Sequence, residues 1–306
     1  MKKVVAVLSL AVLSACGGDK KAEKEIVLDD FNDRIGYVLG ALNAESILKS
    51  GEKMKDMNLE KMVLGFNENL NDKDCSDCDD VLMDLFGPYF QDFDTTHVEA
   101  GSKCLGQKTA FAFYADMMRM GGDEKINFDM VKVGFEHGLY ERDTLIDESE
   151  KRTMVQNFIL DLNVLNGDKM MATAKAMEGV QVFDNGIVLQ TIEEGKGSYP
   201  NATDDVEVEY ILTSSLGDTV QSSYQMKQMK GSDEPIYLSL NGGVIPGWSF
   251  VLPKMKVGGK YRTYIPWELA YGEQGGKESL CFFIELVKSA PQGTFIKPNP
   301  ETLGGM

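Results

Sequence analysis

Positive charge is scarce in this chain of 306 residues. It has 31 lysines and arginines against 48 aspartates and glutamates, which gives a formal net charge of −17. A protein that binds nucleic acid needs clustered Lys and Arg to neutralise phosphates, so this balance argues against a nucleic-acid partner. A solubilising acidic surface is the simpler interpretation. The length allows two domains, each with a core of its own.

Histidine is scarcer still. His97 and His137 are the only two, and we expect both to be ordinary helix or loop residues. So few imidazoles argue against a Ser-His-Asp hydrolase. A zinc site is equally disfavoured, because the single Cys-x-x-Cys of Cys75 and Cys78 has no second pair of ligands. The aspartates around that motif disfavour a reactive thiolate and therefore a redox centre. We expect neither a metal nor a cofactor.

The chain has five cysteines, and those beyond the N-terminal segment are candidates for pairing. In an oxidising compartment Cys104 can pair with either Cys75 or Cys78, which leaves one of those two over. The sequence leaves both pairings open. Cys281 falls in a predicted strand, and we expect it to pack as a small apolar side chain.

The chain has no long hydrophobic run. The N-terminal run from Val4 to Val12 is too short to span a bilayer. Lys2-Lys3 before it and Leu13-Ser14-Ala15-Cys16 after it complete the pattern of an export signal over residues 1–16. The four residues Leu13-Ser14-Ala15-Cys16 resemble a bacterial lipobox, which implies cleavage before Cys16 and lipidation of that cysteine. A secretory peptide with an incidental cysteine is the alternative. Residues 17–28 are polar and predict a flexible tether.

A pattern of apolar residues at helical spacing occurs twice in the first half of the chain. Each copy has an asparagine that can cap a helix and apolar residues on one face: Asn58 with Leu59, Met62, Val63, Phe66 and Leu70, and Asn127 with Phe128, Val131, Phe135 and Leu139. Gly65-Phe66 matches Gly134-Phe135 in register. A helix precedes the first copy, and an acid-started helix follows each. We expect a helical domain over 29–166 and a linker helix over 167–179, within a helix from about Asp147 to about Glu178.

The second half alternates apolar and polar residues, which predicts strands of a half-buried antiparallel sheet. Between two of these strands Trp248, Val251, Leu252 and Met255 recur at helical spacing. The predicted fold class is therefore α+β: a duplicated all-helical N-terminal domain, a long linker helix, and a twisted antiparallel sheet wrapped on a short helix over 180–290. Residues 291–306 are expected to form a flexible tail.

Several motifs in this half occur in the order found in one enzyme family. They are Val206-Glu207-Val208-Glu209-Tyr210, Gln221-Ser222-Ser223-Tyr224, Val244-Ile245-Pro246-Gly247-Trp248, Met255-Lys256-Val257-Gly258-Gly259-Lys260, and Ile265-Pro266 with Leu269-Ala270-Tyr271-Gly272-Glu273. They resemble the catalytic domain of FKBP-type peptidyl-prolyl cis-trans isomerases. The helical half resembles the N-terminal domain of Mip-like members, where it mediates homodimerisation. Duplicated copies can also pair within one chain, so a homodimer and an internal pair both stay open.

The resemblance implies an apolar proline-binding pocket. Trp248 would be its floor, with Tyr210 and Phe282 as walls, while the Tyr271 hydroxyl and the Ile245 backbone N–H would bind substrate carbonyls. The expected substrate-binding residues are Val220, Gln221, Ile236, Leu238 and Val244. For Ile236, Val244 and Phe282, a purely core role explains the sequence equally well.

Three departures from the family predict weakened isomerase activity. One is Asn241-Gly242-Gly243, a segment one residue longer than usual that is expected to alter the approach to Val244. Val220-Gln221 stand where the family usually has Phe-Asp, and only Lys277-Glu278 separate the preceding glycines from the last strand, where the family has a longer loop. The predicted function is a peptidyl-prolyl isomerase that assists the folding of exported proteins and acts on unfolded or proline-containing polypeptides. Its predicted location is the periplasmic or outer face of the outer membrane, anchored through Cys16. The alternative is a periplasmic chaperone with a degenerate proline-binding domain.

Overall fold

The computed structural model describes residues 26–71, 75–88, 92–143, 145–231 and 233–296. The chain divides into two compact units, one ending at Phe158 and the other beginning at Ile159. The α-helices of the first unit are α1 (Phe31–Lys49), α2 (Leu59–Asn69), α3 (Cys78–Phe86), α4 (Val98–Met120), α5 (Phe128–Leu139) and the start of α6 (Glu148–Lys175). The short 3-10 helices η1 (Glu52–Asp56), η3 (Thr95–His97) and η4 (Asp123–Lys125) lie between them. Cys16 lies outside the described residues.

Polar side chains begin the helices where the sequence predicts. The Asn58 side chain accepts a hydrogen bond from the Lys61 N–H at 3.0 Å, and the Asn127 side chain accepts one from the Asp129 N–H at 2.9 Å. These caps satisfy backbone donors that a helix start leaves without partners. The tether expected over 17–28 ends earlier than predicted, because Leu28 is buried in the helical unit.

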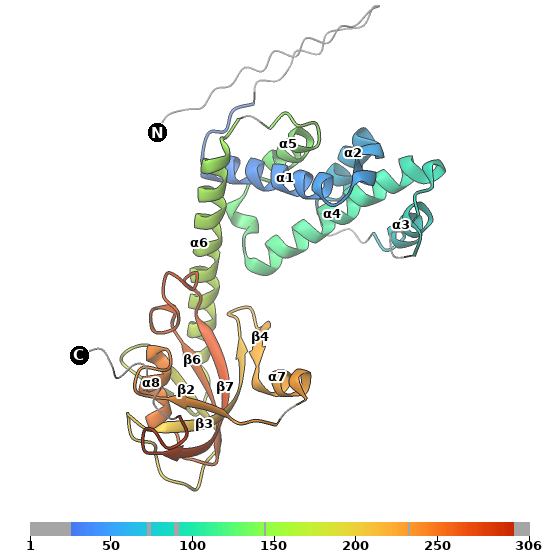
Figure 1. Ribbon diagram of the computed structural model, residues 1–306. Coiled ribbons are helices and arrows are strands. Elements are labelled where there is room, and N and C mark those ends of the chain that lie inside the picture. Colours follow the sequence, from blue (N-terminus) through green and yellow to red (C-terminus); the bar gives the residue numbers. More distant parts are fainter. Residues whose placement is uncertain (1–25, 72–74, 89–91, 144, 232, 297–306) are drawn as a thin grey trace, which may run out of the picture. The chain divides into compact units, whose positions relative to one another are not determined.

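The two copies of the repeat exchange their helices. If each copy is taken with the long helix before it, the first copy is α1 with α2 and the second is α4 with α5. α1 packs on α5 and α2 packs on α4, so each packed pair takes one helix from each copy (Figure 1). The pairs approach closely at glycines: a Cβ added at Gly40 would lie 2.0 Å from the Val131 carbonyl oxygen, and one at Gly65 would lie 2.0 Å from the Lys103 carbonyl oxygen. Phe66 and Phe135, which occupy equivalent positions in the two copies, stack with ring centroids 3.7 Å apart. The copies therefore form an internal pair.

Helix α6 agrees with the helix expected from about Asp147 to about Glu178. It begins at Glu148 and runs without a break through Gly167 to Lys175, so the expected boundary between 166 and 167 falls inside a helix. Gly167 of this helix faces Ser279, whose Oγ would lie 2.7 Å from an added Cβ. A small residue is required there by close packing rather than by flexibility.

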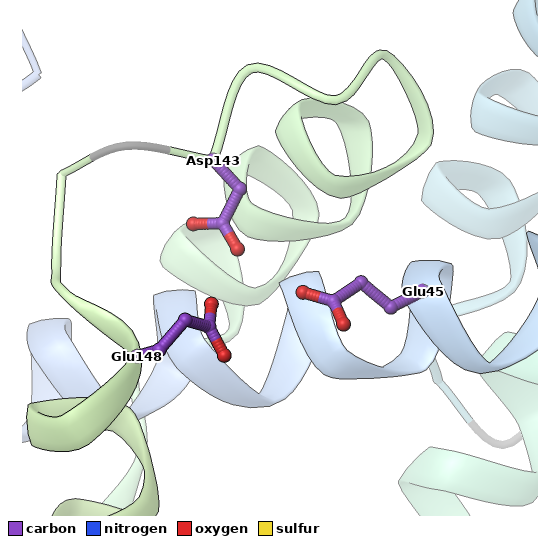
Figure 2. A group of neighbouring side chains, drawn as sticks. All are labelled: Glu45, Asp143 and Glu148. Atoms are coloured by element: carbon purple, nitrogen blue, oxygen red, sulfur yellow. The ribbon is translucent and has the colours of Figure 1, made fainter.

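Three carboxylates converge where α6 begins. Figure 2 shows Glu45, Asp143 and Glu148 turned toward one another, with oxygen atoms within 4.8 Å. The Lys151 ammonium lies among them: it donates to Asp143 and to Glu148 Oε1 at 2.7 Å, and it is 4.0 Å from Glu45 Oε1. Burial lowers the pKa of Lys151, but these hydrogen bonds outweigh burial and raise it overall. Lys151 is thus a buried cation surrounded by carboxylates.

Two cysteines of the first unit lie on facing helices. The Cys78 thiol on α3 donates to Gln107 Oε1 on α4 at 3.2 Å, one helical turn from Cys104. Burial raises the pKa of Cys78 to about 12, with a further contribution from the Cys104 thiol. Both pairings of Cys104, with Cys78 and with Cys75, stay predictions.

The second unit is a seven-stranded antiparallel sheet with the order β1-β2-β6-β7-β3-β4, and β5 also pairs with β3. Its strands are β1 (Val180–Val182), β2 (Val188–Glu193), β3 (Asp205–Thr213), β4 (Thr219–Ser222), β5 (Ile236–Ser239), β6 (Gly259–Ile265) and β7 (Leu280–Ala290). The remaining helices are α7 (Ser223–Lys230), α8 (Pro246–Val251), η5 (Leu252–Lys254) and η6 (Trp267–Leu269). The predicted fold class is confirmed.

The sheet has a core on each face. On one face Trp248, Val251, Leu252 and Met255 pack against inward residues of β3, β6 and β7. On the other face Met171 and Ala174 of α6 pack against Val188 and Tyr264, with Met170, Met177 and half-buried Cys281 beside them. The methionines of α6 are therefore packing residues. Burial also raises the pKa of the Cys281 thiol, as expected for an inert apolar position.

Part of the expected flexible tail is held in place. The backbone N–H groups of Gly293, Phe295 and Ile296 donate to Asp205 Oδ2, and the Phe295 ring stacks on Tyr237 at 4.8 Å. The prediction of flexibility is wrong for this segment, because a buried carboxylate on β3 supplies acceptors that the local sequence does not reveal. Among the described helices, none is long and apolar enough to cross a membrane.

Candidate active site

A small apolar pocket opens beside α8. It has a volume of about 130 Å³ and is lined by Tyr210 of β3, Gln221 of β4, Leu238 of β5, Gly243, Val244 and Ile245, Trp248 of α8, Tyr271, and Phe282 of β7. Larger hollows occur elsewhere, including one of about 470 Å³ on the opposite face of the sheet, but they do not gather aromatic side chains in this way. The aromatic composition, rather than size, singles this pocket out.

Three aromatic rings form the base of the pocket. Trp248 is only 4% exposed, and its ring stands nearly perpendicular to Tyr210, with centroids 5.5 Å apart. Phe282 meets the same indole edge-on at 5.1 Å. Edge-to-face contacts of this kind are favourable and hold rings in fixed orientations. The base is therefore rigid and apolar before any ligand binds.

The local sequence explains how Trp248 reaches this position. Ile245 is extended, and Pro246 then begins α8 at a position where the missing N–H costs nothing. Gly247 presses against β6, since an added Cβ would lie 2.5 Å from Ile265 Cγ2. Because Gly247 has no side chain, the helix packs directly against the sheet. The next side chain, Trp248, then lies at the base of the pocket.

The polar groups of the pocket are few and uncharged. Burial, followed by the neighbouring Tyr271, raises the pKa of Tyr210, so its hydroxyl stays protonated at neutral pH. Tyr271 is 56% exposed at the rim. Among the described residues, no carboxylate, imidazole, thiol or ammonium lines the pocket. It therefore offers hydrogen-bond donors and apolar surface, and no group for general-base or covalent catalysis.

The structure brings together most of the predicted site residues, but not all. Tyr210, Gln221, Leu238, Val244, Ile245, Trp248, Tyr271 and Phe282 line one pocket. Val220 does not, and it is 59% exposed. Successive strand residues face opposite sides, so Val220 points away when Gln221 faces the pocket. Ile236 packs against the core instead. Gly243 also lines the pocket; the sequence pointed to it only as part of the longer segment before Val244.

The segment between η6 and β7 does not cover the pocket. The Asn163 side chain on α6 donates to the Gly276 carbonyl at 2.8 Å and holds this segment against the helix. Tyr271 lines the pocket, but none of residues 272–279 does. The sequence prediction of a shortened substrate-covering loop agrees with this arrangement.

Comparisons with known proteins point to one family. The FKBP-type peptidyl-prolyl cis-trans isomerase domain matches residues 196–287. FKBP-type peptidyl-prolyl cis-trans isomerase FkpA of Escherichia coli O6:H1 is 30% identical over 228 residues, which cover 65% of this chain and 82% of that relative. Outer membrane protein MIP of Legionella longbeachae is 27% identical over 182 residues, 53% of this chain and 75% of the relative. Peptidyl-prolyl cis-trans isomerase Mip of Coxiella burnetii is 29% identical over 185 residues, which cover 54% of this chain and 77% of that relative.

Proposed function

This chain belongs to the family of FKBP-type peptidyl-prolyl cis-trans isomerases and is Mip-like, and we propose that its reaction takes place in the pocket above Trp248. The observation that carries this proposal is the buried indole with Tyr210 and Phe282 set edge-on around it. A proline ring is apolar and compact, and it fits a cavity of about 130 Å³ lined by such rings.

The reaction requires no covalent step. The barrier to rotation about an X-Pro bond is roughly 18–20 kcal/mol, because the partial double bond of the amide must be broken. The twisted amide has lost its charge-separated resonance form, so a dry apolar pocket favours it over the planar amide, which water solvates better. Tighter binding of the twisted state is the catalysis. The absence of acid-base groups among the described lining residues is compatible with this mechanism.

The lining residues have different roles in this proposal. Trp248 supports the proline ring, Tyr210, Phe282, Leu238 and Val244 exclude water, and the Tyr271 hydroxyl and Ile245 N–H donate to substrate carbonyls. Gln221 supplies an amide where the family usually has a carboxylate. Because the covering loop is also short, we propose that turnover is slower than in typical family members.

The test is a protease-free isomerisation assay on a short Ala-Leu-Pro-Phe peptide, with the chain from residue 17 onward beside the Escherichia coli relative. The expected result is acceleration above background at a lower catalytic efficiency than the relative. A catalytic efficiency equal to that of the relative would contradict the proposed slower turnover. No acceleration would contradict the proposed site and favour the alternative, a chaperone that binds proline segments without turnover.

We also propose that the mature protein is anchored to the outer membrane through lipidated Cys16, facing the periplasm. The lipobox-like Leu13-Ser14-Ala15-Cys16 and the similarity to a protein described as outer membrane protein MIP support this. Mass spectrometry of the N-terminal peptide from detergent extracts should detect acyl chains on Cys16, and Cys16→Ser should release the protein from membranes. An unmodified Cys16 in membrane fractions would contradict the anchor.

A further inference from the structure

Tyr271 begins a turn over residues 271–277, here called the rim turn, which is closed by its own backbone. The Gly272 N–H donates to the Trp267 carbonyl at 3.0 Å, and the Gly275 N–H donates to the Tyr271 carbonyl at 3.1 Å. Gly275 also packs against the base of the Tyr271 side chain, since an added Cβ would lie 2.3 Å from Tyr271 Cβ. The position of the rim turn therefore sets the direction in which the Tyr271 side chain points.

The backbone at the end of the rim turn is strained. Gly276 and Lys277 both have positive φ, 73° and 55°. Glycine adopts this left-handed conformation freely, but for a lysine it is uncommon and costs free energy. A residue stays in such a conformation only where its surroundings hold it. The rim turn therefore depends on contacts with a neighbouring element.

Helix α6 supplies such contacts at two positions. The Asn163 side chain donates to the Gly276 carbonyl at 2.8 Å. Four residues later, and so on the same side of the helix, Gly167 packs against buried Ser279. The Ser279 Oγ in turn accepts the Trp267 N–H at 3.2 Å. The first contact holds the end of the rim turn, and the second holds the segment that leads into it.

We propose that Asn163 is a positioning residue for the isomerisation: by holding the Gly276 carbonyl, it keeps the Tyr271 hydroxyl where it donates to a substrate carbonyl. This inference rests on the proposed function of the pocket and extends its support to helix α6. Asn163 does not line the pocket, so it acts on the substrate only through the rim turn. Its removal therefore cannot cost more activity than removal of the hydroxyl that it positions.

The test is a double-mutant cycle on the chain from residue 17 onward, with the Ala-Leu-Pro-Phe tetrapeptide as substrate. Asn163→Ala should lower catalytic efficiency about two- to tenfold, and no more than Tyr271→Phe does, because one hydrogen bond to the substrate is weakened. In the Tyr271→Phe background, Asn163→Ala should have no further effect. Asn157→Ala is the matched control, because Asn157 is exposed on the same helix, and it should leave efficiency unchanged in both backgrounds.

Hydrogen exchange follows the rim turn itself. Backbone amides of residues 272–277 should exchange faster in Asn163→Ala than in wild type or Asn157→Ala, while those of β3 keep their wild-type rates. Alanine is favourable inside a helix, so Asn163→Ala should fold. Unchanged exchange in the rim turn would show that Asn163 does not hold it and would overturn the proposal.

Full activity in Asn163→Ala would also overturn the proposal, and so would losses that multiply in the double variant, because Asn163 would then act independently of Tyr271. If the wild-type chain turns over no peptide, the proposed function fails. The same cycle is then run on tetrapeptide affinity, measured by calorimetry. A loss of affinity in Asn163→Ala that disappears in the Tyr271→Phe background supports the positioning role. No loss, independent losses, or no binding by the wild type contradicts it.

Discussion

Tyr271 and Tyr199 are exposed to almost the same extent, 56% and 54%, but only Tyr271 lines the aromatic pocket. In our account the Tyr271 hydroxyl binds a substrate carbonyl, whereas Tyr199 is an ordinary surface residue. Removing one hydrogen bond of this kind costs about 0.5–1.5 kcal/mol. Tyr271→Phe should therefore lower catalytic efficiency on the tetrapeptide by roughly two- to tenfold.

Tyr199→Phe is the control for that substitution and should have no effect. The measurement is the isomerisation rate at several substrate concentrations for both variants. Full activity in Tyr271→Phe would remove the hydroxyl from the mechanism and leave only the apolar walls.

At the scale of single residues, prediction from sequence succeeded where motifs are short and local. Ile245 and Trp248 are near neighbours in one motif, so their joint position in the pocket follows from the chain itself. Val220 was misplaced because the family's aromatic residue at that point does not fix which way a valine faces in this strand. The burial of Lys151 does not follow from the local sequence, because one of the carboxylates around it, Glu45, comes from a distant part of the chain.

At the scale of elements, the start of α6 depends on Lys151. Its side chain is 2% exposed, and its ammonium lies among the three carboxylates that Figure 2 shows. Lys151→Met would keep the apolar stem but remove the ammonium partner of Asp143 and Glu148. Removing one partner of a buried ion pair costs about 3–5 kcal/mol, so the midpoint of urea denaturation should fall by a corresponding amount.

Lys49→Met provides the matched comparison. Lys49 pairs with Glu45 in the same region, but its side chain is 75% exposed and solvent screens the pair. Its denaturation midpoint should stay close to that of the wild type. Equal effects of the two substitutions would show that the buried ammonium has no special role.

The repeat illustrates what an element-scale pattern leaves undetermined. Equivalent positions at Gly65 and Gly134 indicate two similar helices, but not which helices pack together. The exchange of helices between copies follows from close backbone approach at both glycines: Gly65 meets Lys103 of α4, and Gly134 meets Tyr37 of α1. Such contacts join segments far apart in the sequence, and periodicity carries no information about them.

At the scale of the whole molecule, the internal pair bears on oligomeric state. The two copies bury their packing faces against each other, with Phe66 on Phe135, and so satisfy within one chain an interface that single-copy relatives would need two chains to form. We therefore expect a monomer in place of the homodimer through the helical domain that the resemblance implies. Light scattering coupled to gel filtration should give the mass of one chain over a wide range of concentration, and twice that mass would contradict this expectation.

The central claim is that isomerisation takes place over Trp248, and the chain offers its own control because Trp267 is the only other tryptophan. Trp267 is half-buried in η6 and does not line the pocket. The most direct measurement is the protease-free isomerisation rate of Trp248→Ala beside Trp267→Ala, with circular dichroism to show that both remain folded. Loss of the aromatic floor should remove about 2–3 kcal/mol of transition-state binding, so Trp248→Ala should lose roughly 30- to 150-fold in catalytic efficiency while Trp267→Ala stays near wild type. Comparable activity in the two folded variants would place the reaction elsewhere.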